Sequence, residues 1–109
     1  MQFEVSLTRD ALYVRVRVEG EAGVGRVLSL LQVLALDSRG WSQPAVLLDL
    51  RAVEPAMEEG ARLQVAAAAR RSFPALRKVA LLVPQGGAGE ADGVRVFDDE
   101  AAARAWLEA

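Results

Sequence analysis

Four carboxylates follow one another over a short stretch of the sequence and are the first residues to consider for chemistry. Asp49 closes a buried apolar run, and Glu54, Glu58 and Glu59 come soon after it. The carboxyl ends of buried strands are where α/β proteins place their sites, so these acids are candidates for a divalent-cation site or for carboxylate-only catalysis around Asp49. However, no Asn, His or second Asp stands nearby to complete a coordination shell. Glu58 and Arg62 also have the i,i+4 spacing of an ordinary helix ion pair. We therefore expect a solvated helix start, with Asp49, Glu54 and Glu58 as solvated acids and no metal site.

The composition excludes most other chemistry. The chain contains no His and no Cys, which excludes imidazole bases, thiolate nucleophiles, disulfides and thiolate metal sites. Its net charge is −2 and its isoelectric point is near 5.1. Arg15 and Arg17 share a strand face, and Arg70 and Arg71 are adjacent, but an acidic chain does not favour broad contact with nucleic acid. We therefore predict a protein that is not an enzyme, uses no cofactor and does not bind nucleic acid.

The length of the chain and its hydropathy indicate how many domains it forms and whether it crosses a membrane. A chain of 109 residues with 52% hydrophobic and 26% charged residues suits one globular domain over 1–109. The most apolar stretch, Val24–Leu36, contains Arg26, Ser29 and Gln32 and is shorter than the roughly 20 residues of a bilayer span. No signal-peptide pattern begins the sequence. We predict a cytoplasmic domain without an integral membrane segment. Arg supplies 12 of the 13 basic residues and Ala is abundant, which is typical of a GC-rich bacterial genome.

Apolar periodicity predicts the elements that must position these acids. Period-two alternation indicates a strand hairpin, short apolar runs indicate buried strands, and 3.6-residue periodicity indicates helices. The expected elements are strands around Phe3–Leu7 and Leu12–Val18, a helix from Val24 to about Ser38, a strand at Ala45–Leu50, a loop at Arg51–Ala56, a helix at Met57–Ser72, a strand at Val79–Val83, a mobile loop at Gln85–Gly93, a strand at Val94–Phe97 and a final helix capped by Asp98. The order β-β-α-β-α-β-β-α predicts an α/β fold with a mixed sheet, in which helices connect parallel strands and the hairpin forms an antiparallel edge.

The first helix carries more apolar residues than one buried face needs. Six of them share the face expected to fill the core: Val24, Val27, Leu28, Leu31, Leu34 and Ala35. Leu30, Val33 and Leu36 fall on or beside the polar face and form a patch over successive turns. Two interpretations stay open. Either the loop around Trp41 or the C-terminal segment covers the patch, or it is a surface for a protein partner or for self-association.

Two segments and the order of elements resemble a known family. One is the buried strand Leu47–Arg51, which leads through a loop into a helix. The other is the ending Val94–Glu100 followed by Ala105-Trp106-Leu107. Together they resemble the SpoIIAA-like branch of the STAS superfamily, small bacterial domains similar to anti-sigma-factor antagonists. The resemblance covers nearly the whole chain and implies a regulatory interaction domain without catalysis of its own.

The resemblance also implies an interaction segment with an altered switch. Antagonists of this kind carry a phosphorylatable serine in an Asp-Ser-Ser-Gly segment at the start of the helix after the central strand. Counted from Asp49, that segment corresponds to Met57–Gly60, where Gly60 matches and Glu58 and Glu59 replace both hydroxyl residues. The two acids either imitate a permanently modified state or mark the loss of the switch, so regulation by a kinase is not expected. The implied interaction residues are Asp49, Glu54, Glu58, Glu59 and Gly60.

A second implication concerns ligands. The SpoIIAA-like branch is also similar to CRAL-TRIO lipid carriers. A small apolar ligand, held under the first or second helix, is therefore the alternative to a protein partner.

Overall fold

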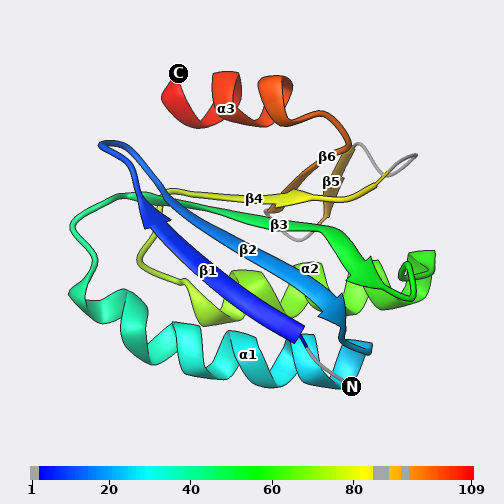
Figure 1. Ribbon diagram of the computed structural model, residues 1–109. Helices are drawn as coiled ribbons and strands as arrows, with labels where there is room; N and C mark the ends of the chain where they lie inside the picture. The colour runs from blue at the N-terminus through cyan, green and yellow to red at the C-terminus, as the bar shows by residue number, and fades with distance from the viewer. Residues whose placement is uncertain (1–2, 85–88, 92–93) are drawn as a thin grey trace.

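A six-stranded mixed sheet forms the centre of the molecule, as the computed structural model shows for residues 3–84, 89–91 and 94–109 (Figure 1). The strands are β1 (Phe3–Arg9), β2 (Val14–Glu21), β3 (Ala45–Glu54), β4 (Lys78–Leu82), β5 (Gly89–Ala91) and β6 (Val94–Phe97). Their spatial order is β1-β2-β3-β4-β6-β5. The central strands β2, β3, β4 and β6 are parallel, and β1 and β5 pair antiparallel at the two edges.

Helices cover the sheet unequally on its two faces (Figure 1). The helices are α1 (Val24–Asp37), α2 (Glu59–Ser72) and α3 (Glu100–Glu108), with a short 3₁₀ turn at Ser38–Gly40. The longer helices α1 and α2 lie on one face, and the short helix α3 lies on the other. The predicted α/β class, with parallel strands joined by helices and a hairpin at one edge, is confirmed. None of the helices in the described ranges is long and apolar enough to cross a bilayer.

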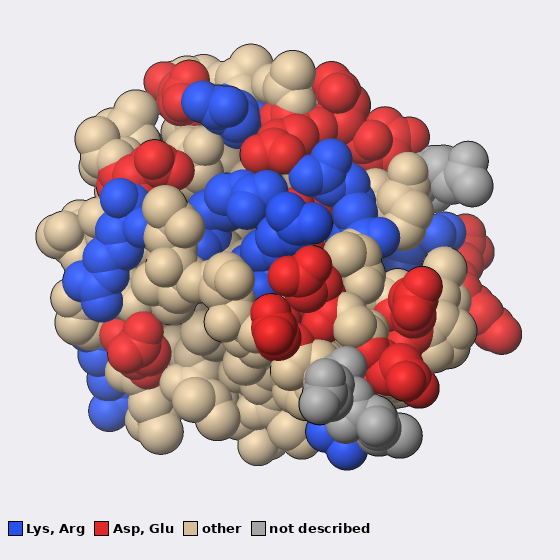
Figure 2. Space-filling model, viewed as in Figure 1, with Lys and Arg blue, Asp and Glu red and all other residues tan. Residues whose placement is uncertain are grey.

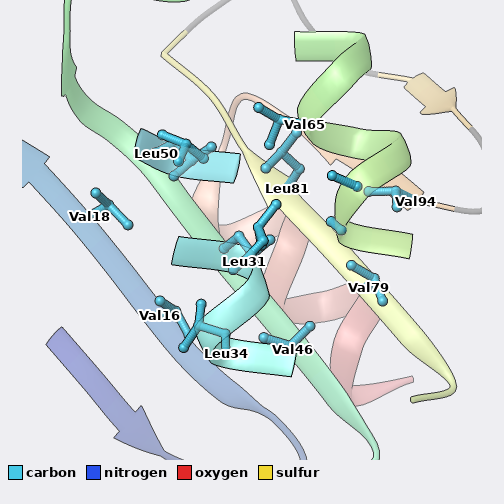
Figure 3. Close-up of a cluster of buried hydrophobic side chains, with 14 of the residues drawn as sticks. Val16, Val18, Leu31, Leu34, Val46, Leu50, Val65, Val79, Leu81 and Val94 are labelled. Atoms are coloured by element: carbon cyan, nitrogen blue, oxygen red, sulfur yellow. The ribbon is translucent and has the colours of Figure 1, made fainter. Parts of the chain in front are cut away.

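The larger core lies between the sheet and the helices α1 and α2 (Figure 3). Alternate residues of each strand point toward these helices, because side chains alternate between the two faces of a sheet. The residues of this core include Val14, Val16, Val18, Val27, Leu31, Leu34, Val46, Leu48, Leu50, Val65, Val79, Leu81 and Val94. A smaller cluster under α3 includes Tyr13, Leu47, Leu82, Ala103 and Leu107.

The central strand β3 continues four residues beyond its predicted end. Asp49 lies opposite Arg17 of β2, but Ala52 lies opposite Glu19, so β3 contains one residue more than β2 over this stretch. Such a bulge shifts the alternation of side chains. Because of it, Leu50 and Val53 are both buried in the larger core although they are three residues apart. The predicted loop at Arg51–Ala56 is therefore wrong for its first part.

Other boundaries also differ from prediction. Gly89–Ala91 forms β5, which pairs with β6, so that part of the expected mobile loop is a strand; residues 85–88 and 92–93 lie outside the described residues. The final helix is capped by Asp99, whose carboxylate accepts a hydrogen bond from the Ala102 amide at 3.1 Å, and not by Asp98. Helix α2 begins at Glu59 and not at Met57, with Glu58 in the cap position.

Candidate functional site

Asp49 lies in the middle of β3 and is the only charged residue that is buried among those described, with 2% of its surface exposed. Its side chain lies on the α3 side of the sheet. Oδ1 accepts hydrogen bonds from the Arg51 amide at 3.1 Å and from Arg51 Nε at 3.0 Å. Oδ2 accepts from Nη2 of Arg51 and from Nη2 of Arg15, each at 2.9 Å. Each carboxylate oxygen thus accepts two hydrogen bonds from groups of the protein.

Glu100, the first residue of α3, closes the network from the other side. Its Oε1 lies 2.7 Å from Arg51 Nη2, and its Oε2 lies 3.3 Å from Arg15 Nε. Two acids and two guanidinium groups therefore tie β2, β3 and α3 together. Figure 2 shows a band of basic side chains across this side of the molecule, with acidic side chains against it. We call Arg15, Asp49, Arg51 and Glu100 the ion-pair network.

The network determines the ionisation of Asp49. Burial alone would raise the pKa of this carboxyl, but hydrogen bonds from the Arg51 side chain and amide, with the charges of Arg51 and Arg15, outweigh burial and hold the pKa below its ordinary value. The hydrogen bond to Asp49 in turn raises the pKa of Arg51. Asp49 is therefore ionised at neutral pH and neutralised by its neighbours. The expectation that it is a solvated acid is wrong, because Arg15 and Arg51 enclose it.

The other candidate acids do not join Asp49. Glu54 is exposed at the end of β3, and Glu58 and Glu59 are exposed at the start of α2, whose helix packs on the opposite face of the sheet. Across residues 3–84, 89–91 and 94–109, no three acids stand close enough to hold a metal ion. The structure thus separates the five implied interaction residues into the buried Asp49 and the exposed residues Glu54, Glu58, Glu59 and Gly60.

The exposed segment Met57–Gly60 presents two carboxylates at a helix start. Met57 is partly buried and packs against the larger core, which anchors the segment. Glu58 is extended, with φ −70° and ψ 169°, and its carbonyl accepts a hydrogen bond from the Arg62 amide at 2.9 Å. A side chain added at Gly60 would meet no atom within 4 Å, so this side of the helix start is open. We call Glu58, Glu59 and Gly60 the acidic helix start.

No ion pair within the described part of the chain neutralises the acidic helix start. The predicted pair between Glu58 and Arg62 does not form, because Glu58 precedes the helix in an extended conformation and lacks the geometry of an i,i+4 pair. The helix dipole favours acids at this position. The segment therefore presents two negative charges to solvent at the start of α2.

The three residues of the apolar patch of α1 differ in their exposure to solvent. Val33 and Leu36 are exposed, at 64% and 66% of their surface, whereas Leu30 is partly buried and packs against the core. Trp41 does not cover them: its ring stacks on Phe73 with 5.7 Å between ring centroids. Of the two interpretations left open, the one in which neighbouring segments cover the patch is wrong for Val33 and Leu36.

Two hollows border this patch, and sequence periodicity alone did not indicate their positions. A groove of about 680 Å³ lies between the C-terminal ends of α1 and α2, with Leu28, Leu36 and Phe73 among its lining residues. A second hollow of about 400 Å³ lies between β1 and α1, with Leu30 and Val33 among its lining residues. Leu36 thus belongs to one hollow, and Leu30 and Val33 belong to the other.

Comparison with known proteins identifies the fold of the chain. No protein-family profile and no curated protein matches the sequence. An anti-sigma factor antagonist from Mycobacterium paratuberculosis has a similar crystal structure, with a TM-score of 0.63 and 18% sequence identity over 99% of this chain and 96% of that chain. An uncharacterised protein with a SpoIIAA-like fold from Shewanella loihica has a TM-score of 0.54 and 17% identity, over 96% of this chain and 93% of that chain. The chain therefore has the STAS/SpoIIAA-like fold, as the resemblance implied.

Proposed function

We propose that this protein is a non-catalytic regulatory module that binds a protein partner through the acidic helix start. The STAS/SpoIIAA-like fold supports this proposal, because one protein with a similar structure is an anti-sigma factor antagonist. The observation that carries it is the pair Glu58 and Glu59, which are exposed at the start of α2 and have no internal counter-charge among the described residues. Basic groups of a partner would provide the missing counter-charges.

The charge of this surface is permanent. Residues 43–71 contain no Ser, Thr or Tyr, so no hydroxyl near the acidic helix start is available for phosphorylation. Each glutamate carries about one negative charge, against nearly two for a phosphate group. We infer that the module binds its partner in one constant state and that its activity is set by concentration and not by a kinase.

The test uses purified anti-sigma factors encoded in the same genome as defined probes. Binding to each is measured by calorimetry for the unmodified chain and for Glu58→Ser with Glu59→Ser. Removing two charged contacts should raise Kd for the cognate factor by about a hundredfold or more, because each charge-assisted hydrogen bond contributes about 1.5–3 kcal/mol.

Glu21→Ser with Glu108→Ser is the matched control, since both residues are exposed and lie outside the acidic helix start. The control should leave Kd unchanged. If none of the anti-sigma factors binds the unmodified chain, an antagonist role is wrong. If the Glu58 and Glu59 variant binds as the control does, the acidic helix start is not the contact surface.

The groove between α1 and α2 favours a second candidate function, the binding of a small apolar chain with an anionic end. Leu28, Leu36 and Phe73 supply apolar surface to a volume of about 680 Å³. Arg39 and Arg71 also line it and have no carboxylate partner in the part of the chain that the structure describes. Ligand sites of a few hundred Å³ are commonly apolar with a few polar groups that orient the ligand.

Dodecanoate is a suitable probe for this groove. Ala75 lines the groove and is exposed, so Ala75→Trp should fill it and weaken dodecanoate binding by about tenfold or more in a calorimetric titration. Ala101→Trp on α3 is the control and should bind as the unmodified chain does. Absence of binding to the unmodified chain, or equal binding by both variants, would rule out this candidate.

A further inference from the structure

The strand β1 forms one edge of the sheet, and nothing in the described residues covers its outer side. It pairs with β2 through seven residues, Phe3–Arg9, and lies last in the strand order. The opposite edge strand, β5, has three residues and contains Gly89. Long edge strands with apolar side chains pair readily with a further strand, whereas short ones are protected. The two edges of this sheet therefore differ in their capacity to add a strand.

The exposed apolar side chains of β1 continue onto α1. Val5 lies opposite Val18, and Leu7 lies opposite Val16, so Val5 and Leu7 point toward the helix side of the sheet. They remain 39% and 38% exposed. Leu30 and Val33 of α1 border the same surface across the hollow of about 400 Å³. In Figure 2 acidic side chains lie directly below the basic band, and the surface below them, toward α1, is largely uncharged.

We propose that this edge pairs with a second copy of the chain, β1 against β1, in an antiparallel arrangement about a two-fold axis at Ser6. That register places the full strand Phe3–Arg9 opposite itself. It sets Val5 opposite Leu7 of the second copy, Glu4 opposite Thr8, and Phe3 opposite Arg9. Each of these contacts occurs twice and no like charges lie directly opposite each other. At the centre of the helix side, Val5 meets Leu7.

The two-fold axis also brings the helices together. A two-fold axis perpendicular to the sheet keeps each face on its own side, so both α1 helices lie on the same side of the joined sheet. Leu30 and Val33 of the two copies then lie next to the paired strands, where they cover the new edge contact. The dimer would thus bury the side of the α1 patch that borders β1 and leave Leu36 at the other groove.

The size of this contact is sufficient for a reversible dimer. Seven residues at about 3.4 Å each give an edge about 24 Å long. A sheet and one helix layer are together about 20 Å thick, so each copy buries roughly 500 Å², or about 1,000 Å² in total. This is the lower bound for specific interfaces, so we expect the dimer to be weak and reversible. The net charge of −2 per chain opposes association only weakly.

Sedimentation equilibrium at protein concentrations from the micromolar to the millimolar range tests the dimer. Val5→Lys places a charge in the middle of the edge and should weaken association by about tenfold or more. Leu63→Lys is the matched control, because Leu63 is 52% exposed on α2 and lies outside the edge. Circular dichroism checks that both variants are folded. A chain that is monomeric throughout, or equal association by both variants, would overturn the proposal.

The absence of cysteine in the sequence allows a direct test of register. Directly opposed Cα atoms lie about 4.5–5.5 Å apart, within the range that a disulfide requires. Ser6→Cys should therefore form a disulfide-linked dimer under mild oxidation, whereas Ser42→Cys, at an exposed loop position, should not. Glu4→Cys should cross-link with Thr8→Cys in a mixture but not with itself. Cross-linking that is equal at Ser6 and Ser42 would exclude the proposed pairing. This dimer uses no residue of the acidic helix start, so it goes beyond the proposed function and can fail separately from it.

Discussion

The two faces of the sheet are stabilised in different ways. The face under α1 and α2 is apolar throughout, and strand residues such as Val16, Leu48 and Leu81 are almost fully buried. The face under α3 has a small apolar cluster, and beside it lies the ion-pair network around Asp49. The difference follows from the area that each helix layer covers. Two long helices exclude water from one face, so the sheet side chains beneath them are apolar. The single short helix covers only part of the other face, and polar side chains cover the rest.

The helix α3 packs on β4 and β6, so β2 and the second half of β3 lie beside it and not beneath it (Figure 1). Asp49 is at this border. Arg15 and Arg51 cover it, with 22% and 36% of their side chains exposed. The network therefore covers the part of the sheet that a longer helix would otherwise cover. We expect substitutions on the two faces to have different effects on stability.

The largest loss of stability is expected on the α1 and α2 face. Leu31 is 2% exposed within the larger core, and Leu31→Ala should lower the free energy of unfolding by about 3–4 kcal/mol because it leaves a cavity. Urea denaturation followed by circular dichroism measures this change. Leu36→Ala is the control on the same helix and should change stability by less than about 0.5 kcal/mol. A loss below about 1 kcal/mol for Leu31→Ala would show that this face is not the main source of stability.

The next largest effect is expected in the ion-pair network. Asp49→Asn removes the buried charge and leaves two guanidinium groups without their shared partner. It should lower the free energy of unfolding by about 2–3 kcal/mol. This is at or below the low end for a broken buried pair, because both arginines reach solvent. Chemical denaturation at neutral pH measures the loss. Glu21→Gln, on an exposed acid of β2, is the control. A stability equal to that of the control would mean that the network is only a surface contact.

The pH dependence of stability provides a test of the same charge. The pKa of Asp49 is lower in the folded state than its ordinary value, so its contribution is present above about pH 4 and is lost as the pH falls through the folded pKa. The difference in unfolding free energy between the unmodified chain and Asp49→Asn should therefore be constant near neutral pH and shrink in acid. Denaturation curves measured across the acidic range give this difference. A difference that persists unchanged at pH values below the folded pKa would contradict the assignment.

Glu100 should contribute less than Asp49 to the same network. It is 31% exposed, and Glu100→Gln should lower the unfolding free energy by about 0.5–1 kcal/mol, as expected of a partly exposed ion pair. Added salt should reduce this loss, because exposed pairs are screened. Thermal and urea denaturation at two salt concentrations measure it. A loss as large as that of Asp49→Asn would show that α3 docking depends on this one contact.

The smallest effect on stability is expected at the apolar patch of α1. Val33→Gln and Leu36→Gln should each change the unfolding free energy by less than about 0.5 kcal/mol when measured on dilute protein, because both side chains are exposed. Self-association should distinguish them: Val33→Gln weakens it and Leu36→Gln does not. Unfolding of either variant would place that side chain in the core. Equal association by both would remove Val33 from the dimer contact.

Much of the fold was predictable because it depends on local periodicity. The repeat of apolar residues in α1 correctly indicated Val27, Leu31 and Leu34 as buried, and alternation in β2 correctly indicated Val14, Val16 and Val18. The resemblance carried by Leu47–Arg51 and the C-terminal segment implied the STAS/SpoIIAA-like fold, which the structural comparison confirms. The exposed position of Glu58 and Glu59 at a helix start was also predictable, since the two acids stand at the beginning of the Ala-rich helix. Their role as a contact surface stays a prediction.

Other features depend on residues that are far apart in the sequence. The partners of Asp49 include Arg15, which is 34 positions away, and the network is completed by Glu100, which is 49 positions from Arg51. No local pattern indicates that these side chains meet. The extension of β3 depends on a bulge against β2, and β5 forms only because β6 provides a strand to pair with.

The sequence by itself determined which residues are apolar, which face of each helix and strand is apolar, and that the chain carries neither His nor Cys. The tertiary structure decided that Asp49 is buried and neutralised, that Val33 and Leu36 are exposed, and that β1 ends the sheet with its outer side open. The physical reason is that periodicity records only the direction in which a side chain points from its own element. Whether another element then covers that side chain depends on the length and placement of segments distant in the chain.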